Sequence, residues 1–326
     1  MALTSLNQTG FIRQPRLRSL VERPLFFAGQ NLQIVRSRLT PFKSTEREIF
    51  RFEQSMSEFE TRRFEYYLKT MGLFDSEYAH QVGDFVRQGY SFYYYDFAPW
   101  LHLFPKRCAF NVIFGDVTDV PAHPSFVKSR PIGTDNQNAV VLKLDSLRHF
   151  RFFQDDLKWQ QKSTSAVWRG HAHNVRRQHL IKQYQGHAFI DAAQTNGTYS
   201  GLPPAKPHMS VANQLKHQFV LSIEGYDVAT NLKWIMASNS LAVSPKLKYE
   251  TWFLEGWLVP GEHFVEIAED FSDLEEKIEF YAAHPKFALE MIENAQAHVR
   301  QFLHPERERM LNILVMYHYF KRSGQI

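Results

Sequence analysis

The sequence has a single cysteine, and this scarcity excludes several scaffolds and sites. With Cys108 alone among 326 residues, no internal disulfide and no cysteine-rich metal site can form. No run approaches the roughly 20 apolar residues of a membrane-spanning helix, and the first ten residues lack a signal-peptide core. We therefore expect a protein of the reducing cytoplasm.

The usual fingerprints of nucleotide binding and hydrolysis are also missing. The sequence contains no GxGxxG, GxxxxGK[ST], GxSxG or HExxH pattern. His171 and His173 flank one alanine, but two histidines without a third ligand nearby are a weak metal signal. We expect neither a metal nor a cofactor.

Charge and aromatic content are the two unusual features that are present. Lysine and arginine total 38 against 34 acidic residues, a net charge of +4, and aromatic residues reach 15%. A basic excess suits a polyanionic partner, and exposed rings can stack on bases or sugars. A phenylalanine-rich core with a solvated basic exterior explains the same composition, so both interpretations stay open.

The hydrophobic pattern changes along the chain. The first ~45 residues are basic and irregular, which fits either a wrapped helical layer or a surface that rests on anionic lipid heads. Helical spacing follows over 47–74, and short apolar runs typical of buried strands occur at 110–114 and 139–144.

From residue 159 onward, strands and helices alternate, which indicates βαβ units around a parallel sheet. The expected strands are 166–168, 188–190, 219–223, 241–243 and 264–267. The expected helices are 176–183, 211–217, 228–237, 249–255, 274–283, 285–302 and 306–321.

One strand-to-helix turn in this half has the composition of an anion site. The strand runs into Gly225, and Asp227 and Thr230 suit the cap of a helix that begins near Val228. The unpaired amides and the dipole of a helix N-terminus attract anions, and Lys233 would add a charge one turn later. The alternative is an ordinary capped helix with an exposed lysine.

Two further segments carry chemistry. A strand ends in Trp168-Arg169-Gly170 and Arg177 follows it, and arginine binds phosphate oxygens bidentately. In the first half, Asp116 follows a strand, in the kind of place where a general base is found. Arg169 paired with a carboxylate, and Asp116 as a simple turn former, are the alternatives.

Taken together, these segments resemble glycosyltransferase family 90 from about Phe110 to Phe302. Trp159–Gly170 resembles the family's tryptophan- and lysine-rich stretch that closes in Phe/Trp-Arg-Gly, and Arg177 resembles the arginine after it. Lys216–Lys233 resembles the donor segment Lys-Tyr-x-Phe-x-x-x-x-x-Gly-x-x-x-x-Ser-Arg-x-Lys. His263-Phe264 and Ser272-Asp273-Leu274 resemble the later His-Tyr and acidic segments.

The sequence also departs from the family's pattern. Asn231 stands where the donor segment has arginine, and Thr230 where it has serine. The base loop falls on 113–118, where only Asp116 matches, so Asp119 stays a rival. Phosphate neutralisation would then fall to other cations, for which the candidates are Arg169, Arg177, Lys233, Lys246 and Lys248.

The resemblance implies an α/β fold of the GT-B type, with two Rossmann-like domains facing one another across a cleft. The acceptor-side domain would be 1–160, the nucleotide-sugar domain 161–300, and the helix in 301–326 would pack back on the first domain. The implied chemistry is inverting and metal-free, with Asp116 as base. The implied donor-binding residues are Trp168, Arg169, Gly170, Arg177, Gly225, Asp227, Val228, Ala229, Thr230, Asn231, Lys233 and Glu250.

Residues 227–234 and 248–252, with Arg148-His149-Phe150, resemble the bacterial lipopolysaccharide branch of the family. We therefore expect transfer of a hexose from a UDP-sugar to a hydroxyl, on a heptose, of the lipopolysaccharide inner core. A capsule glycan or a protein hydroxyl is the alternative acceptor. The alternative of another class is a non-catalytic module for nucleic acid or anionic lipid; we expect no nucleic acid but a peripheral contact with the anionic inner leaflet.

Overall fold

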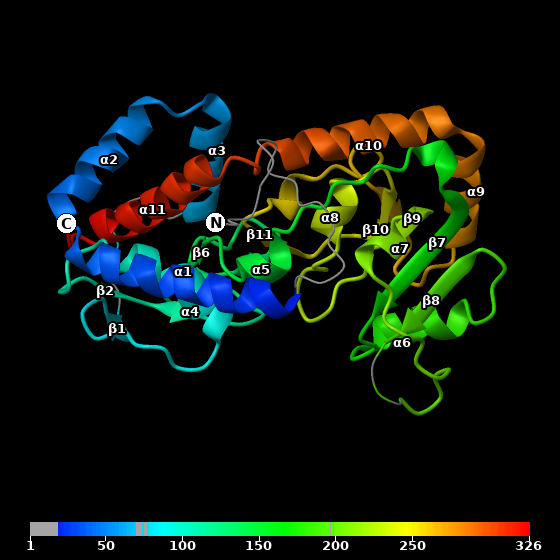
Figure 1. The fold of residues 1–326 in the computed structure, drawn as a ribbon, viewed down its shortest axis with the longest axis horizontal. Coiled ribbons are helices and arrows are strands. Elements are labelled where there is room, and N and C mark those ends of the chain that lie inside the picture. Colours follow the sequence, from blue (N-terminus) through cyan, green and yellow to red (C-terminus); the bar gives the residue numbers. More distant parts are fainter. Residues whose placement is uncertain (1–18, 70–73, 75–76, 196, 198) are drawn as a thin grey trace. The chain divides into compact units, whose positions relative to one another are not determined.

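The computed structural model describes residues 19–69, 74, 77–195, 197 and 199–326 (Figure 1). The chain forms two compact units. Unit 1 comprises residues 149–248 and 254–303, and unit 2 comprises residues 19–148, 249–253 and 304–326. The contact boundaries thus fall at 148 and 303, where the sequence suggested 160 and 300, and residues 249–253 join unit 2. The assignment of acceptor and donor roles to these parts stays a prediction.

Unit 1 is built on one sheet of five parallel strands. The strands are β7 (Ser163–Gly170), β8 (Ile190–Gln194), β9 (His217–Leu221), β10 (Leu241–Pro245) and β12 (Val265–Ile267). The helices are α6 (Val175–Gln183), α7 (Val211–Gln214), α8 (Leu232–Met236), α9 (Leu274–Ala283) and α10 (Pro285–Arg300), with 3-10 turns at Trp159–Gln161 and Glu255–Trp257. The expected α/β class with a parallel sheet is confirmed.

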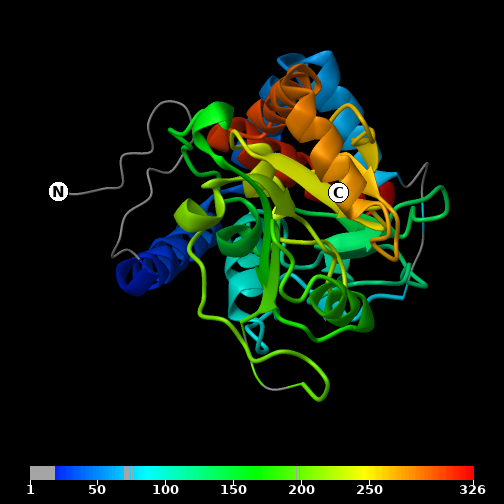
Figure 2. The same ribbon diagram turned by 90° about the vertical axis from the view of Figure 1, so that its right-hand side faces the viewer.

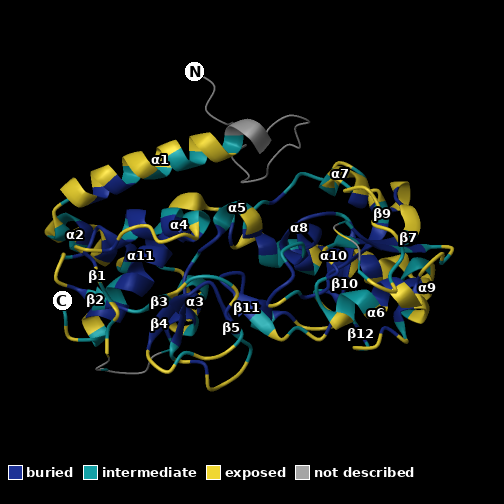
Figure 3. Ribbon diagram, turned by 90° about the horizontal axis from the view of Figure 1, so that it is seen from below, coloured by how far each residue is buried: buried dark blue, intermediate teal, exposed yellow. Residues whose placement is uncertain are grey.

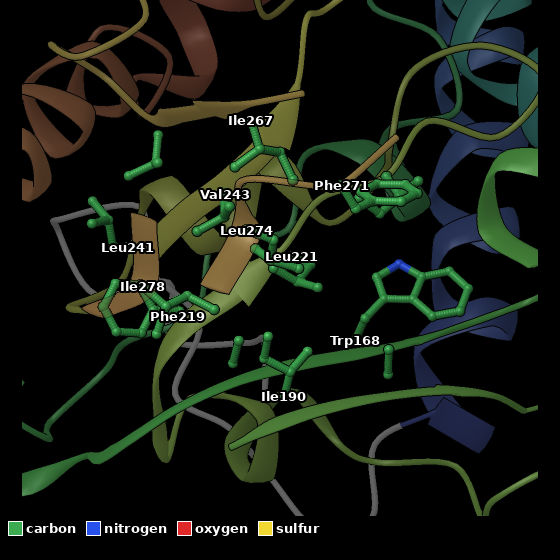
Figure 4. Packing of buried hydrophobic residues seen from close by; sticks show 14 of the residues in the cluster. Trp168, Ile190, Phe219, Leu221, Leu241, Val243, Ile267, Phe271, Leu274 and Ile278 are labelled. Atoms are coloured by element: carbon green, nitrogen blue, oxygen red, sulfur yellow. The ribbon is translucent and has the colours of Figure 1, made fainter. Parts of the chain in front are cut away.

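The core of unit 1 is largely aliphatic, because its strands are covered on both faces. Leu221, Val243 and Ile267 come from three neighbouring strands and pack against Leu274 and Ile278 of α9 (Figure 4). Helices α9 and α10, orange in Figure 2, run along the sheet and contact β12 and β10. This packing holds the strand ends, and the loops that leave them, in place.

Unit 2 contains more helix and only short strands. Its helices are α1 (Ser19–Leu39), α2 (Phe42–Gln54), α3 (Glu58–Leu68), α4 (Ser91–Leu101), α5 (Ser146–His149) and α11 (Pro305–Arg322). Its strands are β1 (His80–Gln81), β2 (Ala109–Phe110), β3 (Val112–Ile113), β4 (Ser125–Val127), β5 (Ser129–Pro131), β6 (Ala139–Val141) and β11 (Tyr249–Thr251). Strands β3, β4 and β6 form a parallel sheet, and two antiparallel pairs, β1–β2 and β5–β11, complete the unit.

Helix α11 organises unit 2, because it packs against α2, α3 and α4. Its buried face carries apolar side chains together with Glu308 and Asn312. Phe126 of β4 lies 4.3 Å, between ring centroids, from Tyr319 of α11, and Phe97 lies 5.5 Å from Phe110. Rings of this unit therefore form much of its core.

The front of the chain contains the helical layer that was one of its two interpretations, since α1 packs its inner face on α4. The helix expected next needs a correction. The single helix expected over 47–74 is two helices, α2 and α3. They are separated at Ser57, whose side chain accepts from the amide of Glu60 while Glu60 accepts from the amide of Ser57. This capping box starts a new helix where the apolar spacing alone continued the old one.

Two expected helices in the second half are also wrong. The helix expected over 228–237 is only α8, which begins at Leu232, because residues 225–231 form a loop. The segment 249–255 contains strand β11, which pairs with β5 in the register Glu250–Arg130. Tertiary pairing thus overrides local spacing in both places. The helices expected over 176–183, 274–283, 285–302 and 306–321 are present as α6, α9, α10 and α11.

Candidate functional site

The strand order of unit 1 marks one edge of its sheet for ligand binding. The order is β8-β7-β9-β10-β12, so the chain runs outward in one direction from β7 and in the other from β9. In open α/β sheets, ligands bind beyond the carboxyl ends of the two strands where the order reverses. Here those ends are Gly170 of β7 and Leu221 of β9, which lie on neighbouring strands (Figure 1). We call this edge the switch-point site.

Asn174 joins the two loops of the switch-point site. As the N-cap of α6, its side chain accepts a hydrogen bond from the amide of Arg177 at 2.9 Å. Its Nδ2 donates to the carbonyls of Glu224 and Gly225, at 3.2 and 3.0 Å, in the loop after β9. One side chain therefore starts the helix and holds the neighbouring loop against it.

Arg177 makes a second connection between the same loops. Its guanidinium donates to the carbonyl of Ile223 at 2.7 Å and to that of His171 at 3.1 Å. It also lies 5.5 Å above the ring of Trp168, a cation–π distance. Burial, together with the charge of Arg176, lowers the pKa of Arg177 to about 10, so the side chain is still a cation at neutral pH.

The two glycines of the site lie in close packing, which is tightest at Gly170. A Cβ on Gly225 would lie 3.2 Å from both Arg177 Nη2 and His173 Nε2, and one on Gly170 would lie 2.7 Å from Cζ2 of Trp168. His173 in turn stacks on Tyr226, with ring centroids 4.5 Å apart. The sequence motif Trp-Arg-Gly thus has a steric reason, since any larger residue at 170 would collide with the buried indole.

Arg169 and Lys233 are engaged elsewhere. Arg169 pairs with the carboxylate of Asp191 on β8 and donates to the carbonyl of Asp191 at 2.8 Å. Lys233 is fully buried, and its ammonium donates to Glu255 Oε1 at 2.6 Å. In this structure both cations are neutralised by a carboxylate, so neither points a free charge at the strand ends.

The remaining donor-segment residues belong to the loop before α8 and do not start a helix. Asp227, Val228 and Ala229 are buried, and the amide of Gly225 donates to the carbonyl of Asp227 at 3.1 Å. The Asn231 side chain donates to the carbonyl of Leu221 at 2.9 Å, and Thr230 beside it is half-buried. Because α8 has only five residues and begins at Leu232, the expected helix dipole at 228–233 is a wrong prediction.

The exposed cations of the site follow β10. Lys246 and Lys248 are both exposed in the segment after this strand. Lys248 pairs with Glu269 at 3.0 Å, and its backbone amide donates to Glu224 Oε1 at 3.1 Å. Glu224 is buried and lies 3.6 Å from Arg176. Of the five cations proposed for phosphate neutralisation, Arg169, Lys233 and Lys248 are thus paired with a carboxylate, whereas Arg177 bonds carbonyls and Lys246 is exposed.

Glu250, expected among the donor-binding residues, lies in unit 2. It is buried, accepts from Arg130 Nε at 2.7 Å and accepts from the hydroxyl of Tyr66 at 2.7 Å. These bonds connect β11, β5 and α3, so the ion pair stabilises unit 2.

The two candidate bases, Asp116 and Asp119, also lie in unit 2, in the loop after β3. Asp116 Oδ1 accepts from Lys128 Nζ at 2.5 Å, and the Asp116 side chain is 30% exposed while that of Lys128 is 1% exposed. Asp119 is exposed and accepts from the hydroxyl of Thr118 at 3.0 Å. A buried lysine therefore orients Asp116 while leaving it accessible. Within the described residues, no three histidine, cysteine or acidic side chains gather into a metal-binding group.

Comparison with known proteins then gives the family. The sequence model of glycosyl transferase family 90 matches residues 141–322, more than half of the chain. The chain belongs to glycosyltransferase family 90. The matched span contains the whole switch-point site and begins after Asp116, and both the donor-binding residues and the base stay predictions.

Two relatives of this family 90 chain carry informative names. O-glucosyltransferase LpsA of Dichelobacter nodosus is 44% identical over 282 residues, covering 85% of this chain and 89% of the relative. Protein O-glucosyltransferase 2 of Danio rerio is 28% identical over 152 residues, covering 44% of this chain and 30% of that protein. Both are named as enzymes that transfer glucose to oxygen.

Sequence reasoning missed four residues of this family 90 site: Asn174, His173, Glu224 and Tyr226. Asn174 carried a readable signal, because an asparagine directly before a helical segment is a common N-cap. The other three carried none, since their contacts join loops that are about 50 residues apart. Only the order of the strands brings those loops together.

Proposed function

We propose that this glycosyltransferase moves a hexose, with glucose first among the candidates, from a UDP-sugar to a heptose hydroxyl of the lipopolysaccharide inner core, in the cytoplasm. The observation that carries the donor half is the switch-point site, where Arg177 and Asn174 hold two loops at the carboxyl ends of β7 and β9. The names of both relatives support glucose. The bacterial relative, which covers most of the chain, supports a bacterial acceptor.

The proposed reaction is a single displacement with inversion. The acceptor oxygen attacks the anomeric carbon, the bond from that carbon to the diphosphate oxygen breaks, and UDP leaves with the electron pair. Asp116 takes the proton of the acceptor hydroxyl, and Lys128 orients its carboxylate. The proposal requires units 1 and 2 to act on one substrate pair, as in a GT-B enzyme.

Charge on the departing diphosphate has to be balanced by fixed groups, because we propose a reaction without metal. Arg177 supplies a cation held in place by two carbonyls, and the exposed Lys246 and Lys248 would add two more, Lys248 by exchanging its contact with Glu269. Preorganised donors of this kind stabilise developing charge without reorganising during the reaction. We assign Lys233 and Glu255 to support of this loop, since their charges compensate one another inside unit 1.

The decisive experiment supplies the purified chain with UDP-glucose, UDP-galactose or UDP-xylose and with lipopolysaccharide truncated in the inner core. We expect a glucosylated heptose, identified by mass spectrometry and by the anomeric coupling in NMR. Turnover should persist in EDTA. Transfer to a peptide serine and none to lipopolysaccharide would favour a protein acceptor, which the name of the Danio rerio relative makes the second candidate.

The base is tested with the matched pair Asp116→Asn and Asp119→Asn. Asp116→Asn should lower kcat about 10²- to 10⁴-fold, the usual contribution of a general base. UDP affinity, measured by calorimetry, should stay within about threefold, since the carboxylate meets the acceptor and not the diphosphate. Asp119→Asn should leave kcat nearly unchanged. The reverse pattern would move the base to Asp119.

A further inference from the structure

Helix α1 has two apolar faces, and only one of them is packed. On the inner face, the Phe27 ring lies 5.4 Å from Phe92 and 5.0 Å from Tyr95, between centroids, and Ile34 is buried. Arg38 hydrogen-bonds His102 at 3.1 Å near the end of the helix. These contacts with α4 and the turn after it fix the rotation of α1 about its own axis.

The opposite face of α1 is exposed and apolar. Leu25, Leu32, Val35 and Leu39 are 58%, 72%, 56% and 78% exposed, and Ala28 between them is exposed as well. Their spacing of three, four and seven residues places them in one stripe along the helix, about 21 Å long at 1.5 Å per residue. Figure 3 shows this outer side of α1 in yellow over most of its length. We call these five residues the outer stripe.

Exposed charge on α1 and on the helix that follows it is predominantly positive. Helix α1 carries Arg23, Arg36 and Arg38 against the single acid Glu22. In the next helix, Lys43, Arg47 and Arg51 are exposed beside an exposed Phe50. Two of the three acids of that helix are paired, Glu48 with Arg309 at 2.5 Å and Glu53 with His318 at 2.8 Å, and the third, Glu46, is half-buried. The surface thus combines exposed apolar side chains with cations.

We propose that the outer stripe of α1 docks the protein on an anionic lipid surface, with its leucines in the acyl boundary and the arginines at the phosphate level. An amphipathic helix with a basic border is the usual form of such a contact. No described helix is long and apolar enough to cross a membrane, so α1 would lie in the surface. A second copy fits less well, because a stable dimer takes about 20–30 residues a side and the stripe offers five.

This inference is independent of the proposed reaction. The family model begins at residue 141, more than 100 residues after α1, and the switch-point site lies in unit 1. Substitutions that remove the outer stripe should therefore lower binding to the lipid surface and leave donor binding intact.

The test is co-sedimentation of the full chain with vesicles of phosphatidylcholine, alone or mixed with phosphatidylglycerol. We expect binding to the mixed vesicles that high salt weakens. Leu32→Glu and Leu39→Glu should each reduce this binding at least about tenfold, because each removes a leucine side chain that would be buried in the acyl boundary of the vesicle. The control Phe287→Glu, at a side chain 52% exposed in α10, should bind as wild type. Because all three side chains are exposed, circular dichroism melts should match.

A second measurement reports insertion directly. Leu32→Cys can be labelled selectively with an environment-sensitive dye, because the native Cys108 is fully buried. We expect a blue shift and protection from aqueous quencher on mixed vesicles. An unchanged spectrum, or equal sedimentation of wild type and Leu32→Glu, overturns the proposal. A concentration-dependent dimer that Leu32→Glu dissolves, without vesicle binding, would assign the stripe to a second copy.

Discussion

The switch-point site of unit 1 and the core of unit 2 hold their arginines in different ways. In unit 1, cations stand at the edge of a parallel sheet, and Arg177 holds backbone carbonyls rather than a carboxylate. In unit 2, Arg63 and Glu308 are buried together, and so are Arg130 and Glu250. Buried ion pairs occur in both units, since Lys233 and Glu255 are buried together in unit 1. What distinguishes the switch-point site is that Arg177 is held by carbonyls and keeps an uncompensated charge. Net charge alone could not distinguish these two arrangements.

The aromatic residues divide in a similar way. Phe85, Phe97 and Phe126 belong to one connected group of rings in unit 2, with Phe97 5.5 Å from Phe85 and 5.6 Å from Phe126. The core of unit 1 is mostly valine, leucine and isoleucine around a few rings. Much of the 15% aromatic content therefore fills a core built on short strands, and it does not by itself indicate a ligand surface.

The largest loss of stability should come from breaking a buried ion pair of unit 2. Glu308 accepts from Arg63 at 2.5 Å and from the indole of Trp252 at 2.6 Å. Although burial alone would raise the pKa of Glu308, the charges of Arg63 and Lys143 hold that pKa below its usual value. Glu308→Gln leaves a buried guanidinium uncompensated and should cost about 3–5 kcal/mol.

Native-state hydrogen exchange measures this cost peptide by peptide, so unit 1 serves as an internal reference. The matched variant Arg309→Gln breaks the more exposed pair with Glu48 and should cost less than about 1 kcal/mol. Equal losses of stability in both variants would show that burial does not determine how much each ion pair contributes to the free energy of unfolding.

The second effect depends on pH. Burial raises the pKa of Asp96 to about 7, although Ser146 donates to its carboxylate from Oγ at 2.7 Å and from its amide at 2.6 Å. The folded-state pKa lies above the ordinary aspartate value of 3.8, so the stabilisation is complete at low pH and is lost as pH rises toward about 7.

Asp96→Asn does not titrate, so its stability relative to wild type should increase by about 2–4 kcal/mol between pH 4 and pH 8. Hydrogen exchange of α4 or urea unfolding at each pH measures the difference. A difference that stays constant with pH would show that Asp96 ionises in the folded chain as it does in the unfolded one.

The third effect belongs to unit 1. Arg177→Met removes the cation and its bonds to two loop carbonyls, and should raise the UDP Kd about 10- to 100-fold, the worth of a charged hydrogen bond. Arg176→Met is the neighbouring control, because Arg176 already pairs with Glu269 at 3.0 Å. Calorimetry should find less than about threefold change for the control. Comparable losses would mean that total charge, and not the fixed guanidinium, binds the diphosphate.

The smallest effects compare one helix cap in each unit. Asn174→Ala and Ser57→Ala should each cost about 1 kcal/mol of stability in their own unit. Only Asn174→Ala should also weaken UDP binding, by about threefold to tenfold, since Asn174 holds the carbonyls of Glu224 and Gly225. A weaker UDP affinity in Ser57→Ala would mean that unit 2 contributes to donor binding.

Much of unit 1 could be predicted from its sequence, because alternating strands and amphipathic helices leave local patterns. Helix α9 occupies 274–283, the range that its spacing predicted. The prediction of a helix at 249–255 was wrong, because β11 pairs with strand β5, which lies more than 100 residues away in the sequence. The sequence also indicated the family and the segment around Gly225. It did not indicate which carboxylates pair with Arg169 and Lys233.

The sequence by itself determined the family and the parallel α/β class, since these depend on local pattern, whereas the strand order that makes the two loops meet comes from the tertiary structure. Only the tertiary structure decided which cations remain available. Lys233 meets Glu255 22 residues away, and Arg63 meets Glu308 245 residues away. The scarcity of cysteine excluded disulfides and cysteine-rich metal sites as supports of the fold, and the structure shows what stabilises unit 2: rings and buried ion pairs. Desolvation makes an unpaired buried charge costly, so the fold must bring a distant partner to each one.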